Sequence, residues 1–307
     1  MCYILLHRET HCLRVARCYM CDVVCSAAVA AAAAADVAIL CTSTFSCEGS
    51  DRSSLSMPAA EDALIPAVAA GRTPSVVVVT APGVALLPWS NLTAGILYIG
   101  MPGQEAGNAV ADILTGAVVP SGKTTLTWPT VENQTQFSAS AYPGLPSYFP
   151  LEANYEEELL IGYRYFDAHN IAPAFPFGHG LSYTTFKYTA LTVSTSNVSC
   201  VVTNVGQVTG AEVAQLYISF PASAGEPPLQ LKGFQVRNSA VVLNKPVRTT
   251  MMLCGLCCFA EVLALAWSID DCYIPLDSAL VFNLGCQLAC VDGCARLVRC
   301  SNRRLVA

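Results

Sequence analysis

The run of β-branched residues in PSVVVVTAPG, residues 74–83, is the feature that most limits the fold. It offers no polar side to water, so it fits a strand buried on both faces, as strands of parallel sheets are. Similar apolar strands are expected at 36–41 and 94–100. Parallel strands need crossover connections, and helices are predicted at 60–70 and 107–116. This part of the chain is therefore predicted to be an open α/β sandwich.

The hydrophobic period changes to two near residue 188. From there, YTALTVSTSNVSCVVTNVGQVTGAEVAQLYISF alternates apolar and polar residues between turns at Asn-Val-Gly and Thr-Gly. This pattern predicts an antiparallel β-sandwich. Residues 130–150 are rich in Pro, Ser, Gln and Tyr and should form an irregular connector.

The cysteines separate both ends of the chain from its middle. Of 16 cysteines, seven precede residue 48 and eight follow residue 253, which leaves only Cys200 between them. A disulfide framework would be expected to staple the body of a domain instead. We divide the chain into a Cys-rich segment (1–26), an α/β sandwich (27–130), a connector (131–187), an incomplete β-sandwich (188–250) and a second Cys-rich segment (251–307).

Several classes of ligand find little support in the sequence. Charged residues make up only 12% of the chain and the net charge is −6, so we expect no nucleic acid partner. The C-x-x-C at Cys18 and Cys21 has no second knuckle at zinc spacing, and the stripe Cys286, Cys290, Cys294 suits a buried helix as well as a metal site. GMPGQEAG lacks the Lys-Ser/Thr of a phosphate loop. We predict no metal and no cofactor.

A membrane or secretion signal is equally weak. Residues 251–267 are apolar except for Glu261, but at 17 residues they reach only the lower limit of a membrane span. We expect a buried segment there, or sequence that does not belong to the fold. The first 21 residues have charges among their apolar residues and lack the apolar region of a signal peptide.

Glu48, in FSCEGSDRSSLSM, is the candidate for acid/base chemistry. It follows a predicted strand, and Asp51 and Arg52 come directly after it. A glutamate in a polar loop is usually only solvated, yet sites form where loops gather at the carboxyl ends of parallel strands. His179 in FPFGHGLSYTTF lacks a nucleophile motif and is expected to be packed. Three N-glycosylation sequons begin at Asn91, Asn133 and Asn197.

Several motifs, in order, resemble glycoside hydrolase family 3. CEGSDRSSLSMPAAEDALI, VVVVTAPGVALLPW, GMPGQEAGNAVADILTGAVVPSGKTTLTWP and YEEELLIGYRYFDAHNIAPAFPFGHGLSYTTF are similar to the C-terminal half of its β-glucosidases. NVGQVTGAEVAQLYIS and PLQLKGF resemble the family's fibronectin type III-like domain. The resemblance covers residues 27–234, and beyond it the sequence departs from the family pattern, so the sandwich is expected to be incomplete.

The resemblance implies retaining hydrolysis of terminal β-glucosyl residues by two carboxyl groups. It makes Glu48 the candidate acid/base and places the nucleophile, an aspartate, on an N-terminal (β/α)8 barrel. A barrel takes about 250 residues, whereas 47 precede Glu48. We therefore expect a fragment, from a truncated or mis-joined gene model or a shortened paralogue, that is inactive alone.

The family's partner would be a β-glucoside or oligosaccharide, and its location extracellular or vacuolar. Two other functions stay open from the sequence. The chain could be a non-catalytic module that binds carbohydrate or a partner, or a membrane-tethered protein that uses residues 251–267. An upstream reading frame that encodes a barrel with a catalytic aspartate would favour the enzyme. Polysaccharide binding without hydrolysis would favour the binding module, and detergent-dependent solubility would favour the membrane-tethered protein.

Overall fold

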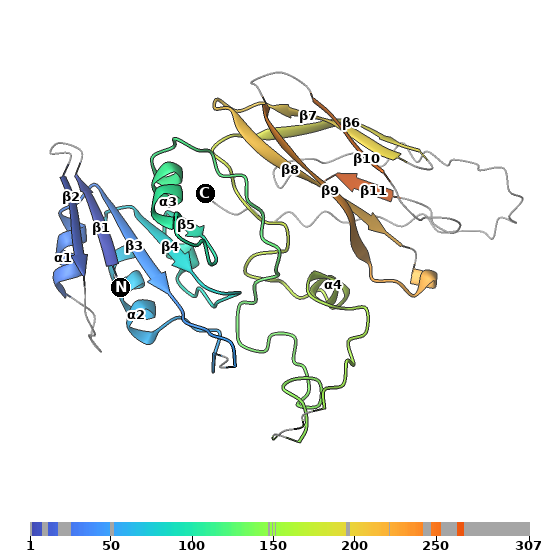
Figure 1. The fold of residues 1–307 in the computed structure, drawn as a ribbon, viewed down its shortest axis with the longest axis horizontal. Helices are drawn as coiled ribbons and strands as arrows, with labels where there is room; N and C mark the ends of the chain where they lie inside the picture. The colour runs from blue at the N-terminus through green and yellow to red at the C-terminus, as the bar shows by residue number, and fades with distance from the viewer. Residues whose placement is uncertain are drawn as a thin grey trace, which may run out of the picture.

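Two parts of different architecture make up the computed structural model (Figure 1). An α/β layer with β1–β5 lies on one side and two small antiparallel sheets lie on the other. The structure describes residues 2–7, 12–17, 26–49, 52–146, 148, 150, 152–194, 197–220, 222–241, 247–252 and 263–266.

Three parallel strands form the centre of the α/β layer. They are β3 (Val37–Ser43), β4 (Ser75–Thr80) and β5 (Gly95–Tyr98). β4 pairs with β3 on one side and with β5 on the other. Because β4 is the middle strand of the three, Val77 and Val79 are fully buried. The predicted parallel sheet is confirmed.

Helices lie against both faces of this sheet. α1 (Ser26–Ala33) and α2 (Ala59–Ala69) share one hydrophobic core with β3 and β4, and Ile96 and Tyr98 of β5 pack against it. Leu97 alternates with these two residues and faces α3 (Ala106–Leu114), so α3 lies against the opposite face. Gly116, with φ of 77°, follows the end of α3 in the left-handed conformation that favours glycine.

An antiparallel hairpin extends the sheet beyond β3. β1 (Cys2–His7) pairs with β2 (Cys12–Arg17) and with β3, which gives the strand order β2-β1-β3-β4-β5. The sequence analysis did not predict these two strands.

Two three-stranded antiparallel sheets form the second part. One has the order β10-β7-β6 and the other β11-β8-β9. A cluster that contains Phe186, Tyr188 and Val202 from the first sheet and Ala214 from the second packs the two together. The predicted antiparallel architecture is thus confirmed. The strands are β6 (Phe186–Val193), β7 (Asn197–Asn204), β8 (Gly210–Ser219), β9 (Leu229–Val241), β10 (Val247–Met252) and β11 (Leu263–Ala266).

Residues 131–187 are mostly turns and loops, with one short helix, α4 (Tyr163–Ala168). Two 3-10 turns, η1 (Ser90–Leu92) and η2 (Ala222–Ala224), lie in other loops.

A short ladder fixes the end of the connector. Residues 124–128 and 174–179 run side by side, and Trp128 N donates to Phe175 O at 2.9 Å while Thr124 N donates to His179 O at 2.7 Å. Gln215 Nε2 on β8 donates to Gly178 O at 3.1 Å, so this ladder is attached to the second part of the molecule.

Candidate active site

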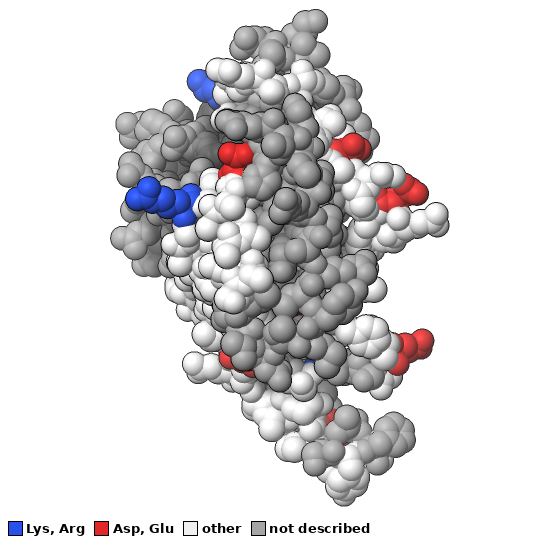
Figure 2. Space-filling model, turned by 90° about the vertical axis from the view of Figure 1, so that its left-hand side faces the viewer, with Lys and Arg blue, Asp and Glu red and all other residues white. Residues whose placement is uncertain are grey.

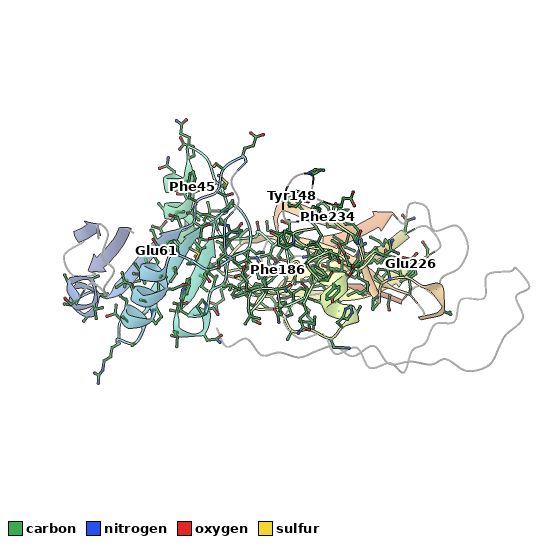
Figure 3. The ribbon with its side chains drawn as sticks, turned by 90° about the horizontal axis from the view of Figure 1, so that it is seen from below. Phe45, Glu61, Tyr148, Phe186, Glu226 and Phe234 are labelled. Atoms are coloured by element: carbon green, nitrogen blue, oxygen red, sulfur yellow. The ribbon has the colours of Figure 1, made fainter. Side chains whose placement is uncertain are left out.

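Glu48 lies at the carboxyl edge of the parallel sheet, as its position after β3 predicts. It is exposed, in a turn whose next residue, Gly49, has a φ of 74°. Phe45, labelled in Figure 3, is 81% exposed on the same loop. Glu48 makes no hydrogen bond or ion pair with the part of the chain that the structure describes. Asp51 lies outside that part. The Glu48 carboxylate is therefore presented to solvent and does not stabilise the fold.

The chain entering this loop is anchored to α2. Glu61, also labelled in Figure 3, accepts hydrogen bonds at Oε2 from the Thr42 hydroxyl and, at 3.2 Å, from Ser43 N. Thr44 N then donates to Thr80 O at 3.1 Å, which extends the pairing of β3 with β4 by one bond. The loop therefore starts from a fixed point.

The chain leaving the loop is anchored from two directions. Arg52 Nη2 donates to Val84 O at 2.8 Å. Leu86 N donates to Leu55 O at 2.9 Å. On the other side, Leu55 N donates to both carboxylate oxygens of Glu132, each at 3.2 Å. The Glu48 turn therefore projects between two anchored segments.

The GMPGQEAG loop, at the end of β5, shares the edge with the Glu48 loop, as expected. Gly100 and Gly103 have φ values of 59° and 74°, so the turn itself requires glycine. Burial raises the pKa of Tyr98, and the positive charge of Arg52 opposes this shift. Arg52 therefore acts electrostatically on β5 as well as bonding to the loop after β4.

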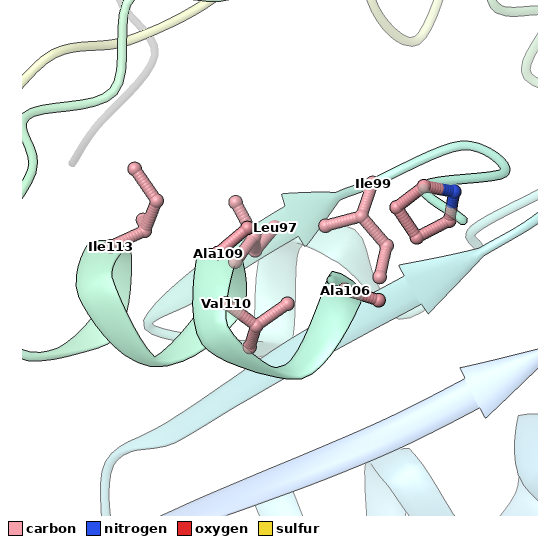
Figure 4. Close-up of a pocket in the computed structure, with 7 residues that line it drawn as sticks. Leu97, Ile99, Ala106, Ala109, Val110 and Ile113 are labelled. Carbon is pink, nitrogen blue, oxygen red and sulfur yellow. The ribbon is translucent and has the colours of Figure 1, made fainter. Parts of the chain in front are cut away.

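An apolar groove of about 220 Å³ lies between β5 and α3 (Figure 4). Leu97, Ile99, Val110 and Ile113 are among its seven lining residues, none of which carries a titratable side chain. The groove offers no group for acid/base chemistry. The sequence analysis did not predict this groove, although the apolar residues of α3 recur at helical spacing and form one face of the helix.

His179 is packed, as predicted. Its ring centroid lies 5.4 Å from that of Phe175, and its backbone N donates to Thr124 Oγ1 at 3.1 Å. The ring therefore lies at the ladder between residues 124–128 and 174–179.

Cysteine and metal chemistry is sparse in the described residues. Cys41, Cys47 and Cys200 are thiols there. No group of three or more His, Cys, Asp or Glu side chains among the described residues is placed to hold a metal ion. The candidates Cys18, Cys21, Cys286, Cys290 and Cys294 lie outside them.

Figure 2 and the helices of the described part bear on a basic patch and on a membrane span. On the face in Figure 2 the few Lys and Arg side chains lie apart from one another. None of the helices that the structure describes has the length and apolar character needed to cross a bilayer. Residues 251–267 are described only in part.

Of the three sequons, Asn91 is exposed on η1 and Asn133 is exposed in the connector, where its Oδ1 accepts from Phe137 N at 3.2 Å. Asn197, half-buried, begins β7.

Comparison with known proteins shows the family of the chain. Residues 15–183 match the model of the glycosyl hydrolase family 3 C-terminal domain. The chain therefore belongs to glycoside hydrolase family 3, and the family resemblance of the sequence is confirmed.

Its relatives are β-glucosidases. It is 37% identical over 212 residues to a probable β-glucosidase I of Aspergillus flavus, which covers 63% of this chain and 24% of that protein. It is 38% identical over 217 residues to thermostable β-glucosidase B of Acetivibrio thermocellus, covering 67% of this chain and 28% of that protein. The chain thus spans about a quarter of the length of these curated relatives.

Solved structures agree. β-Glucosidase 3B from Thermotoga neapolitana, in complex with glucose, gives a TM-score of 0.69 at 32% identity and covers 74% of this chain and 33% of that one. β-Glucosidase D2-BGL from Chaetomella raphigera gives 0.63 at 38% identity and covers 74% and 35%.

Proposed function

We propose that this chain is part of a retaining β-glucosidase and supplies its acid/base residue, Glu48. The observation that carries the proposal is the Glu48-Gly49 turn. It presents an uncommitted carboxylate at the carboxyl edge of the sheet, between two anchored segments, in a chain whose relatives are β-glucosidases. A fibronectin type III-like identity for the second part belongs to the same proposal.

The chemistry follows from two carboxyl groups about 5–5.5 Å apart. Glu48, protonated, donates its proton to the leaving oxygen while the second carboxylate attacks the anomeric carbon and forms a glycosyl ester. Glu48, now a carboxylate, then takes a proton from water, whose oxygen displaces the ester. A carboxylate on a turn that is fixed at both ends, with no hydrogen bond to the described residues, suits a group that must change protonation state twice.

The nucleophile, in this proposal, comes from a barrel domain that the 307 residues do not contain. The family resemblance supports this position, and the chain covers 24% of the length of the Aspergillus flavus relative. The chain alone is therefore expected to hydrolyse no β-glucoside.

The test has two stages. First, the purified chain is assayed with an aryl β-glucoside. Turnover that Glu48→Gln abolishes would overturn the claim that the nucleophile lies outside these 307 residues. Second, the transcript is sequenced across both ends, and the full-length product of the gene is assayed with Glu48→Gln. The substitution should lower turnover of cellobiose by about 10²–10⁴-fold, the usual contribution of general acid/base catalysis. Unchanged turnover would overturn the role of Glu48.

A second candidate is a non-catalytic module that binds carbohydrate. The connector exposes Tyr142, Tyr148 and Tyr155 at 74%, 71% and 79%, and exposed aromatic rings offer apolar faces to sugar rings. Pull-down on an insoluble β-glucan, without hydrolysis and reduced by Tyr155→Ala, would support this alternative. An absence of binding would remove it.

A further inference from the structure

Leu55, the residue that ends the Glu48 loop, is held from two sides. Leu55 donates its N–H to Glu132 and accepts a hydrogen bond at its carbonyl from Leu86 N. Glu132 lies in the connector, whereas Leu86 lies between β4 and η1. Leu55 is thus a fixed point where three separate segments meet.

Glu132 holds more than one residue at this point. Its Oε2 also accepts a hydrogen bond from Ser54 Oγ at 3.1 Å, and Ser54 Oγ in turn accepts one from Ser56 N at 3.0 Å. One carboxylate therefore orders three consecutive residues. The two that bond to it directly, Ser54 and Leu55, lie 78 and 77 positions away from it in the sequence.

These contacts matter for Glu48 because its side chain makes no hydrogen bond with the described residues. The position of its carboxylate depends on where the chain enters, at β3, and where it leaves, at Arg52 and Leu55. A hydrogen bond to a charged acceptor is stronger than one between neutral groups, so Glu132 is a stronger anchor than the neutral bond from Leu86.

We propose that Glu132 is a positioning residue for the acid/base Glu48, acting through Ser54 and Leu55. The inference rests on the proposed function of Glu48. Glu132 has no part in proton transfer. Its carboxylate holds the outgoing end of the loop, so that the acid/base keeps its distance from the glycosidic oxygen. Misplacement by about 1 Å is enough to slow a reaction roughly 10²-fold.

The first measurement needs no catalysis. Amide hydrogen exchange is followed in the 307-residue chain with Glu132→Ala, Glu132→Gln and the control Glu152→Ala. Glu152 is an exposed connector glutamate with no side-chain hydrogen bond to the described residues. Exchange at Leu55 should rise about tenfold in Glu132→Ala, less in Glu132→Gln, which keeps one oxygen acceptor, and not in Glu152→Ala. If exchange at Leu55 is unchanged in Glu132→Ala, Glu132 does not hold Leu55 in place and the proposal is wrong.

The second measurement uses the full-length product of the gene. Acid catalysis matters most for poor leaving groups, so Glu132→Ala should lower kcat on cellobiose at least about fivefold more than kcat on 2,4-dinitrophenyl β-glucoside, with little change in KM. A general loss of folded protein would lower both equally and would overturn the positioning role.

Glu48→Gln, measured beside it, separates this inference from the proposed function. If Glu48→Gln shows the leaving-group dependence and Glu132→Ala does not, the positioning role is wrong and the acid/base assignment stands. If Glu48→Gln leaves cellobiose turnover unchanged, the acid/base assignment is wrong, and the positioning role is overturned with it.

Discussion

Lys123 Nζ lies 3.4 Å from Glu212 Oε2, and this ion pair joins the segment after α3 to strand β8. The two side chains are only 12% and 9% exposed. Lys123 Nζ also donates to Gly180 O at 2.6 Å, and Tyr188 Oη donates to Glu212 Oε1 at 3.0 Å. Burial and the charge of Glu212 raise the pKa of Tyr188, so the phenol stays protonated. Both charges are compensated in a site that water hardly reaches.

Removing the cation should therefore leave a buried, uncompensated carboxylate. We expect Lys123→Met to lower the free energy of unfolding by about 3 kcal/mol in urea titration, since breaking a buried pair costs about 3–5 kcal/mol. Lys187→Met, on the exposed side of β6, is the control and should change it by less than about 0.5 kcal/mol. Adding Glu212→Gln to Lys123→Met should restore part of the loss. Equal losses in both lysine variants would contradict the pairing.

Gly180 and Gly122 make a matched pair for testing the connector ladder. A Cβ on Gly180 would lie 2.0 Å from Gly122 O, whereas a Cβ on Gly122 would meet nothing within 4 Å. Because the obstacle is backbone, Gly180→Ala must push the two segments apart, and we expect a loss of about 3 kcal/mol in thermal unfolding. Gly122→Ala should be neutral or slightly stabilising. A similar melting temperature for the two variants would show that the segments do not meet so closely.

The local pattern of the sequence was enough to place the central strands. The side chains of β4, SVVVVT, can be buried only if the strand lies between two layers of the fold. Because β3 pairs with β4 in parallel, Glu48, which follows β3, lies at the carboxyl edge of the sheet. The β1–β2 hairpin was missed because charges interrupt its apolar residues, and its position depends on pairing with β3. The anchors Glu61 and Glu132 could not be predicted either. Each bonds residues at least 18 positions away, and nothing in its own neighbourhood indicates a partner.

Asp167 on α4 gives a pH dependence whose sign is fixed. The residue is exposed as a whole, but partial burial of its carboxyl group raises the pKa of Asp167 from 3.8 to about 6. Between these values the folded chain binds more protons than the unfolded chain, so stability is fully present below pH 3.8 and falls as pH rises to about 6. Asp167→Asn should therefore stabilise the fold at pH 7, by on the order of 1 kcal/mol after screening by solvent. The gain should vanish in urea titrations below pH 4. A gain that is the same at both pH values would contradict the shifted pKa.

Asn91 should be the preferred site of N-glycosylation if the protein is secreted or vacuolar, as we propose from its family. Its side chain is exposed on η1 and makes no hydrogen bond with the described residues, so a glycan there displaces nothing. Asn133 already accepts a hydrogen bond from Phe137 N, and Asn197 lies within a paired strand.

Expression through the secretory pathway of a eukaryotic host, followed by peptide mass spectrometry with and without glycosidase, measures the occupancy of each sequon. Asn91 should be the most fully occupied, and Thr93→Ala should abolish its modification while leaving the other two sequons unchanged. Full occupancy of Asn197 beside an empty Asn91 would mean that exposure in the folded chain does not decide the choice. In that case the hydrogen bond from Phe137 N to Asn133 would be no reason to expect low occupancy at Asn133 either.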